Sequence, residues 1–126
     1  QGNFRSCSGL ASITIPNNVT VIEPVAFASC TSLESITIPD SVTTIEAGAF
    51  ATCTGLTGIT IGSGVSSMGD DTFNGCTGLS TINCLATSAP SLGINSFQNV
   101  LTTTINVPVG ATYPATYGGL TVNFNL

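Results

Sequence analysis

The sequence predicts a β-rich repeat solenoid, a coil in which one short strand from each turn stacks on the strand of the next turn. Phenylalanine, cysteine, leucine and isoleucine recur in one order every 23 residues, as in Phe27, Phe50 and Phe73. Each unit contains an alternating apolar and polar segment, such as SITI at residues 12–15 and 35–38. Proline follows both of these segments and suits the end of a strand, where no N–H is needed.

The repeat unit reads F-x-x-C-x-x-L-x-x-I-x-I-P-x-x-V-x-x-I-x-x-x-A. Alternation along SITI sends both isoleucines to one side of an extended strand and the serine and threonine to the other. One such strand cannot bury its face alone, but strands stacked at about 4.8 Å build a parallel sheet with continuous apolar ladders. The predicted core is Phe27, Cys30, Leu33, Ile36, Ile38, Phe50, Cys53, Leu56, Ile59, Ile61, Phe73, Cys76, Leu79, Ile82 and Cys84.

The second half of each unit predicts a short extended piece, as at residues 42–45, followed by a tight helical turn. Pro24 and the Asp70–Asp71 pair precede Phe27 and Phe73, where both residue types suit the first turn of a helix. The aspartate pair could instead bind calcium. We favour the cap, because no further carboxylates lie nearby in the repeat frame.

These motifs resemble the BspA-like branch of the leucine-rich repeats, a class common on bacterial surface proteins. The resemblance covers residues 4–108, and the ending INVPVGATYPATYGGL at residues 105–120 is similar to the terminus of such arrays. It implies a right-handed leucine-rich-repeat coil with a stacked parallel sheet. It also implies secretion or surface display, adhesion to host or bacterial partners, and no enzymatic activity.

We predict a single domain over residues 1–126, with repeats over about 4–108. The first repeat is partial (residues 1–10), and a C-terminal cap covers about 109–126. The fourth repeat gains one residue in 85–97 and loses one in 98–104, with Val100 and Leu101 approximately filling the cysteine and leucine positions. The tail alternates apolar residues and predicts a last strand over the open end of the stack, with Leu120, Val122, Phe124 and Leu126 on one side. We expect the chain to be part of a longer protein.

Four cysteines recur at the same repeat position: Cys7, Cys30, Cys53 and Cys76. Equivalent positions of a stack lie on a line, whereas zinc needs four sulfurs around one point. Parallel Cβ directions and an odd total of five cysteines disfavour disulfides. The chain has no histidine or lysine to activate a thiolate. The sequence therefore predicts cysteines packed in the core, with no metal and no cofactor.

Composition excludes several classes of function. A net charge of −5 with one basic residue, Arg5, argues against binding to nucleic acid or to an anionic membrane. No apolar run approaches the roughly 18 to 20 residues that a membrane span needs. Carboxylates are scattered, and no nucleophile–base pair can be assembled, so we expect no enzyme.

The outward strand positions are the candidate binding face, expected to be concave: Ser12, Thr14, Ser35, Thr37, Gly58, Thr60, Thr81, Asn83, Thr104 and Asn106. Threonine also simply suits an exposed strand. We expect an extracellular or surface module that binds host or bacterial surface proteins, with extracellular matrix as one candidate. The alternatives are a spacer that displays another domain, and a glycan-binding module with only Tyr113 and Tyr117 as stacking rings outside the phenylalanine core.

Overall fold

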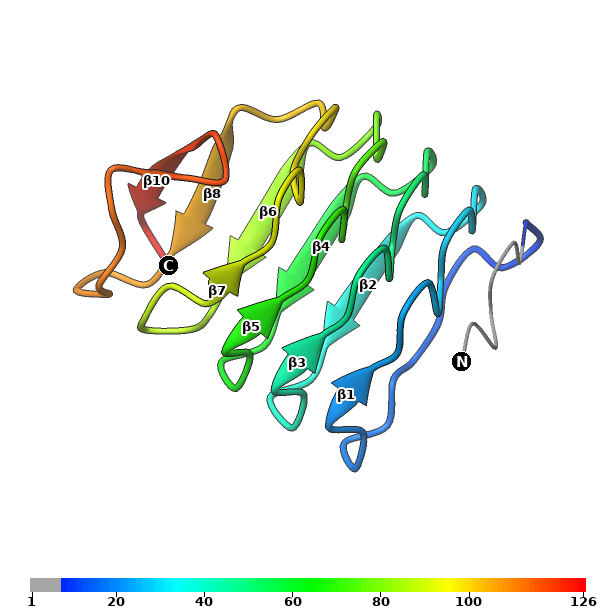
Figure 1. The fold of residues 1–126 in the computed structure, drawn as a ribbon, viewed down its shortest axis with the longest axis horizontal. Coiled ribbons are helices and arrows are strands. Elements are labelled where there is room, and N and C mark those ends of the chain that lie inside the picture. The colour runs from blue at the N-terminus through cyan, green and yellow to red at the C-terminus, as the bar shows by residue number, and fades with distance from the viewer. Residues whose placement is uncertain (1–7) are drawn as a thin grey trace.

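The computed structural model describes residues 8–126, which form a coil of stacked turns built around two β-sheets (Figure 1). The smaller sheet has the order β1-β3-β5-β7 and consists of β1 (Val21–Ile22), β3 (Thr44–Ile45), β5 (Ser67–Met68) and β7 (Ser91–Leu92). The larger sheet has the order β2-β4-β6-β8-β10-β9 and consists of β2 (Ser35–Ile38), β4 (Gly58–Ile61), β6 (Thr81–Cys84), β8 (Thr104–Val107), β9 (Thr116–Tyr117) and β10 (Leu120–Phe124). The predicted solenoid is confirmed.

Neighbouring strands are parallel and pair residues one repeat apart. Ile36 of β2 lies beside Ile59 of β4, which lies beside Ile82 of β6. The smaller sheet keeps the same step, since Ile22 pairs with Ile45. Each side chain therefore packs on its own equivalent in the next turn, and apolar positions form continuous ladders.

The core lies between the two sheets and the turns that join them. Each of the fifteen predicted core residues is at most 5% exposed. The phenylalanines form one stack, with ring centroids 5.2 Å apart for Phe27 and Phe50 and 5.4 Å apart for Phe50 and Phe73. Parallel rings at this spacing give close contact along the whole coil. Leu10 is 36% exposed, because among the described residues it has a neighbouring turn on one side only.

Alternate backbone amides in the turns that contain Phe27, Phe50 and Phe73 donate hydrogen bonds in two directions. The N–H of Phe27 donates to the carbonyl of Ala49 in the next turn of the coil at 2.8 Å. The N–H of Ala28 donates instead to the carbonyl of Val25, three residues earlier, at 3.1 Å. A helix needs every amide to bond within its own segment. Because every second amide is used between turns of the coil, this segment cannot continue as a helix.

The expectation of short helical turns is therefore wrong: residues 8–126 contain no helix, and Pro24, Asp70 and Asp71 cap none. None of these residues belongs to a helix that could cross a membrane. Left-handed backbone recurs instead at two positions of each turn: Val25, Ser29, Gly48, Thr52, Asp71, Gly75, Asn95 and Asn99.

The fourth turn of the coil gains and loses one residue where the sequence predicts it. Met68 pairs with Leu92, one position beyond the usual step, whereas Asn83 pairs with Asn106 at the usual step. Leu101 does not fill the buried leucine position, because its side chain is 62% exposed, and Thr102 occupies the equivalent place.

The C-terminal segment extends the larger sheet. β10 runs parallel to β8, with Val122 beside Ile105, and folds back on β9 through a turn at 118–119. The alternation along β10 predicts the burial of Leu120 and Val122, but Phe124 is 43% exposed. The buried hydroxyl of Tyr117 donates to the carbonyl of Pro90 at 2.6 Å and ties this cap to the fourth turn of the coil.

Val25 carries backbone strain that its repeat equivalents avoid. Its φ of 51° is unfavourable for a β-branched residue, whereas glycine occupies the same position at Gly48. We predict that Val25→Asn raises the free energy of unfolding by about 1 kcal/mol, because asparagine tolerates this conformation. Chemical denaturation would measure the change. Val109→Asn, at a residue that is 74% exposed and has a negative φ, is the control and should leave stability unchanged. A less stable Val25→Asn variant would contradict the assignment of strain.

Candidate functional site

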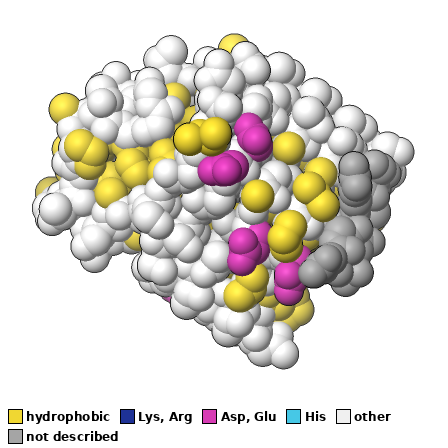
Figure 2. All heavy atoms as spheres, viewed as in Figure 1, with side chains coloured by type: hydrophobic (Ala, Val, Ile, Leu, Met, Phe, Trp, Pro, Cys, Tyr) yellow, Lys and Arg dark blue, Asp and Glu magenta, His cyan; other side chains and the backbone are white. Residues whose placement is uncertain are grey.

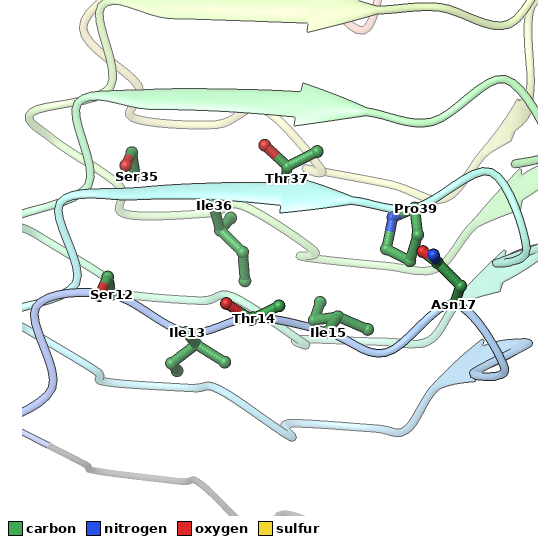
Figure 3. A pocket seen from close by; sticks show the side chains of 9 residues that line it. All are labelled: Ser12, Ile13, Thr14, Ile15, Asn17, Ser35, Ile36, Thr37 and Pro39. Carbon is green, nitrogen blue, oxygen red and sulfur yellow. The ribbon is translucent and has the colours of Figure 1, made fainter.

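The outer face of the six-stranded sheet, the side turned away from the core, carries the predicted binding residues. Figure 3 shows Ser35 and Thr37 on one side of β2 and Ile36 on the other. None of the ten predicted residues is buried. Eight of them lie in register on β2, β4, β6 and β8, where Thr37 pairs with Thr60 and Thr60 with Asn83. The structure therefore brings these residues together in two parallel ladders.

The first turn of the described chain departs from this regular pairing. Ser12 forms an isolated parallel bridge with Ser35, but residues 13–17 pair with no strand. Figure 3 shows the chain from Ser12 to Asn17 running alongside β2, with a space between the two segments. Thr14 thus belongs to the outer face without continuing the hydrogen-bonded ladder.

The cap adds two residues to the outer face that the sequence analysis did not include. Thr121 pairs with Thr104, and Asn123 pairs with Asn106. The sequence does contain a pattern that could have identified them, because TVN at 121–123 resembles TIN at 81–83 and at 104–106. The spacing of this last segment is shorter than the repeat, so counting by period misses it.

One of the two ladders on the outer face changes along the coil from hydroxyl to amide groups, from Thr37 and Thr60 to Asn83 and Asn106. The side-chain amide of Asn106 donates to the side-chain oxygen of Asn83 at 2.9 Å, which orients both groups. Thr37 and Thr60 take part in none of the side-chain hydrogen bonds found within residues 8–126. Their hydroxyls can therefore donate and accept hydrogen bonds from a ligand.

Charge is nearly absent from the outer face. Glu34 directly precedes β2, and Asp40 follows it by two residues, so the two carboxylates lie at opposite ends of the strand. Figure 2 shows acidic side chains beside hydrophobic ones on the face of the molecule that it views. The sequence has one basic residue, Arg5, which lies outside the described residues.

The Asp70–Asp71 pair is occupied by internal hydrogen bonds. One carboxylate oxygen of Asp70 accepts the N–H of Ile94 at 2.9 Å, and one of Asp71 accepts the side-chain amide of Asn74 at 2.9 Å. No group of three or more potential metal ligands occurs within residues 8–126. The pair thus stabilises turns of the coil, although it does not cap a helix.

The cysteines of the described chain are free thiols in the core. The thiol of Cys53 donates to the carbonyl of Phe27 at 3.1 Å, and that of Cys76 donates to Phe50 at 3.1 Å. The neighbouring Cys53 thiol and burial raise the pKa of Cys76, and burial raises the pKa of Cys84. The hydrogen bond with Cys76 lowers the pKa of Cys53, but the Cys53 thiol is fully buried. Buried structural thiols are inert as nucleophiles. Cys7 lies outside the described residues.

Comparison with known proteins finds relatives of this repeat. A family model described as a BspA type leucine rich repeat region matches residues 1–117 in six copies. A solved leucine-rich repeat protein from Bacteroides ovatus is 32% identical, with a TM-score of 0.60 over 75% of this chain and 24% of that one. A solved leucine rich cell surface protein from Faecalibacterium prausnitzii is 30% identical, with a TM-score of 0.69 over 89% of this chain and 31% of that one. This chain therefore spans less than a third of either protein. Among curated proteins, none matches significantly.

Burial of the thiols predicts that the folded protein resists alkylation. Under iodoacetamide treatment, Cys30, Cys53, Cys76 and Cys84 should stay unlabelled in buffer and react fully in guanidinium chloride, as followed by mass spectrometry of peptides. Leu101→Cys, which places a thiol at a position that is 62% exposed, is the positive control. Rapid labelling of Cys30 or Cys53 in the folded chain would show that these residues are accessible rather than core residues.

Proposed function

The chain belongs to the family of BspA-type leucine-rich repeat proteins, and from this premise we propose that it is an extracellular interaction module. Its partners in this proposal are proteins on host or bacterial surfaces, with extracellular matrix included. They bind to the outer face of the six-stranded sheet, and the module has no catalytic role. One observation carries the proposal: the outer face holds ladders of short polar side chains that no other part of the described chain covers.

The composition of the outer face supports binding to protein. Hydroxyl and amide groups there can pair with the backbone and with polar side chains of a partner. A broad surface with little charge does not attract partners over long distances, so specificity must come from contact geometry. The rigid register of the strands supports this, because it holds the side chains of neighbouring turns of the coil at fixed spacing.

The extracellular location rests on the relatives. One of the two solved relatives is described as a cell surface protein. Buried cysteines are compatible with an extracellular protein that forms no disulfide among residues 8–126. A spacer role is the second candidate, and the uninterrupted stacking of turns in the coil favours it, because such stacking makes a stiff rod. Glycan binding is the third, and it is weakened because both tyrosines pack in the cap instead of lying on the outer face.

Three lysines placed on the outer face should abolish binding. The variant Thr37→Lys, Thr60→Lys, Asn83→Lys introduces long charged side chains in three neighbouring strands, and we expect binding to fall at least tenfold with little change in stability, since all three positions are solvent-accessible. Binding of the fluorescent protein to a decellularised matrix preparation and to intact bacterial cells, read by imaging and flow cytometry, measures the effect.

The matched control places the same charge away from the outer face. Thr31→Lys, Thr54→Lys, Thr77→Lys changes three exposed threonines that also lie one repeat apart, in the turns before β2, β4 and β6. This control should bind like the unmodified chain. Equal binding by both triple variants would refute the outer face as the interaction surface, and a chain that binds neither preparation would favour the spacer role.

A further inference from the structure

A groove borders the outer face, first along β2 and then at the ends of β2 and β4. One hollow of about 340 Å³ lies between β2 and the first turn of the coil, and a second of about 490 Å³ continues past the ends of β2 and β4. The two hollows share Asn17, Thr37 and Pro39, so they form one depression. We call it the rim groove.

Gly62 lies in the floor of the rim groove, at a point where two turns of the coil stack closely. Pro39, Gly62 and Leu85 directly follow β2, β4 and β6, and all three line the second hollow. A Cβ atom on Gly62 would lie 2.5 Å from the carbonyl oxygen of Ile38, so stacking of the turns requires glycine there. Two apolar residues, Pro39 and Leu85, flank Gly62 in the lining of this hollow, and Leu85 is 36% exposed.

The first hollow exists because the initial turn of the coil diverges from β2. The segments 12–15 and 35–38 have the same sequence, SITI, but only Ser12 pairs with the next turn of the coil. Figure 3 shows the space that opens between Thr14 and Ile15 on one side and Thr37 and Pro39 on the other. The rim groove is thus open toward solvent along this side.

Polar groups of the rim groove favour a cationic ligand. Asp40 is exposed and lines the second hollow with Thr37 and Thr60. One of its oxygens accepts the N–H of Ser63 at 2.7 Å, which fixes the carboxylate in place. No lysine, arginine or histidine occurs within residues 8–126, so this carboxylate has no cationic side chain of the described chain as a partner. A net charge of −5 adds to the attraction for a cation.

The dimensions of the rim groove suit a short extended peptide. From Asn17 to Leu85 it crosses three steps between turns of the coil, or about 14 Å at 4.8 Å per step. An extended chain rises about 3.3 Å per residue, so about four residues fill this length. The rim groove offers an apolar contact at Leu85, hydroxyl groups on its threonines and one carboxylate. A matching peptide segment carries an apolar side chain, backbone hydrogen-bonding groups and a cation.

We propose that the rim groove binds an extended peptide segment of a partner protein, in which an apolar side chain lies next to lysine or arginine. The apolar side chain packs between Pro39 and Leu85, the cation pairs with Asp40, and the peptide backbone bonds to the hydroxyls of Thr37 and Thr60. This inference rests on the proposed function and specifies the chemistry of its partner.

Four capped peptides test the proposal by nuclear magnetic resonance: Gly-Lys-Leu-Lys-Gly, Gly-Gln-Leu-Gln-Gly, Gly-Lys-Gly-Lys-Gly and Gly-Gln-Gly-Gln-Gly. The first should shift the backbone amide signals of Thr37, Thr60 and Leu85 most strongly, and loss of either its charge or its leucine should weaken binding about threefold to tenfold. The affinity of the first peptide should fall as salt rises. Equal binding of all four peptides, or shifts confined to other surfaces, would overturn the proposal.

Single substitutions assign the effect to the rim groove. Asp40→Asn keeps the oxygen that accepts Ser63 N–H but removes the charge, and Leu85→Asn removes the apolar contact; each should weaken the first peptide about threefold or more. Glu34→Gln, an exposed carboxylate before β2, and Ile94→Asn, at a residue 69% exposed, are the matched controls and should change nothing.

The same variants separate this inference from the proposed function. If Asp40→Asn and Leu85→Asn bind matrix and bacterial cells normally while Thr104→Lys, Asn106→Lys on the outer face does not, the face binds partners and the rim groove is not the contact. The variants and the unmodified chain could all fail to bind matrix and bacterial cells while the peptide Gly-Lys-Leu-Lys-Gly still binds the rim groove. That result would contradict the proposed partners but support the peptide site in the rim groove.

Discussion

The fold depends on backbone hydrogen bonds between residues one repeat apart. In the turns that contain Phe27, Phe50 and Phe73, alternate amides bond to the next turn, as Phe27 does to Ala49, while amides between them close the turn locally. This pattern forces the turns to stack in parallel, and it places each side chain on its own equivalent. Burial then follows, because isoleucines stack on isoleucines and phenylalanine rings lie 5.2 to 5.7 Å apart along the core. A single turn of the coil has neither set of contacts, so stability comes from the stack.

The same register determines the surface. Each outward position on one strand has an equivalent position about 4.8 Å away on the next strand, so the outer face consists of ladders rather than isolated groups. Small changes along a ladder therefore create local sites. The replacement of threonine by asparagine after Thr60 converts hydroxyls to a bonded pair of amides. The close stacking that requires glycine at Gly62 also places a residue without a side chain in the lining of the rim groove.

The 23-residue period of the sequence was sufficient to predict the solenoid, the inward positions and the two outer ladders. Each of these follows from counting residues along strands that alternate apolar and polar side chains. The turns were predicted incorrectly as helical, since their amides bond to a neighbouring turn of the coil that no local pattern reveals. Leu101 was misplaced because the fourth turn loses a residue near it, and register there is decided by pairing of β8. Thr121 and Asn123 were missed because the cap shortens the repeat, and the rim groove depends on a diverging first turn with a regular sequence.

Deleting one repeat tests most directly whether register between turns of the coil holds the protein together. Removal of residues 37–59 joins Ile36 to Thr60 and preserves the alternation of inward and outward positions. This shortened chain should keep its circular dichroism spectrum and unfold cooperatively, with moderately lower stability. Removal of residues 37–58, one residue fewer, joins Ile36 to Ile59 and reverses the faces that follow, so cooperative unfolding should be lost. Equal stability of the two deletion variants would contradict the central role of register.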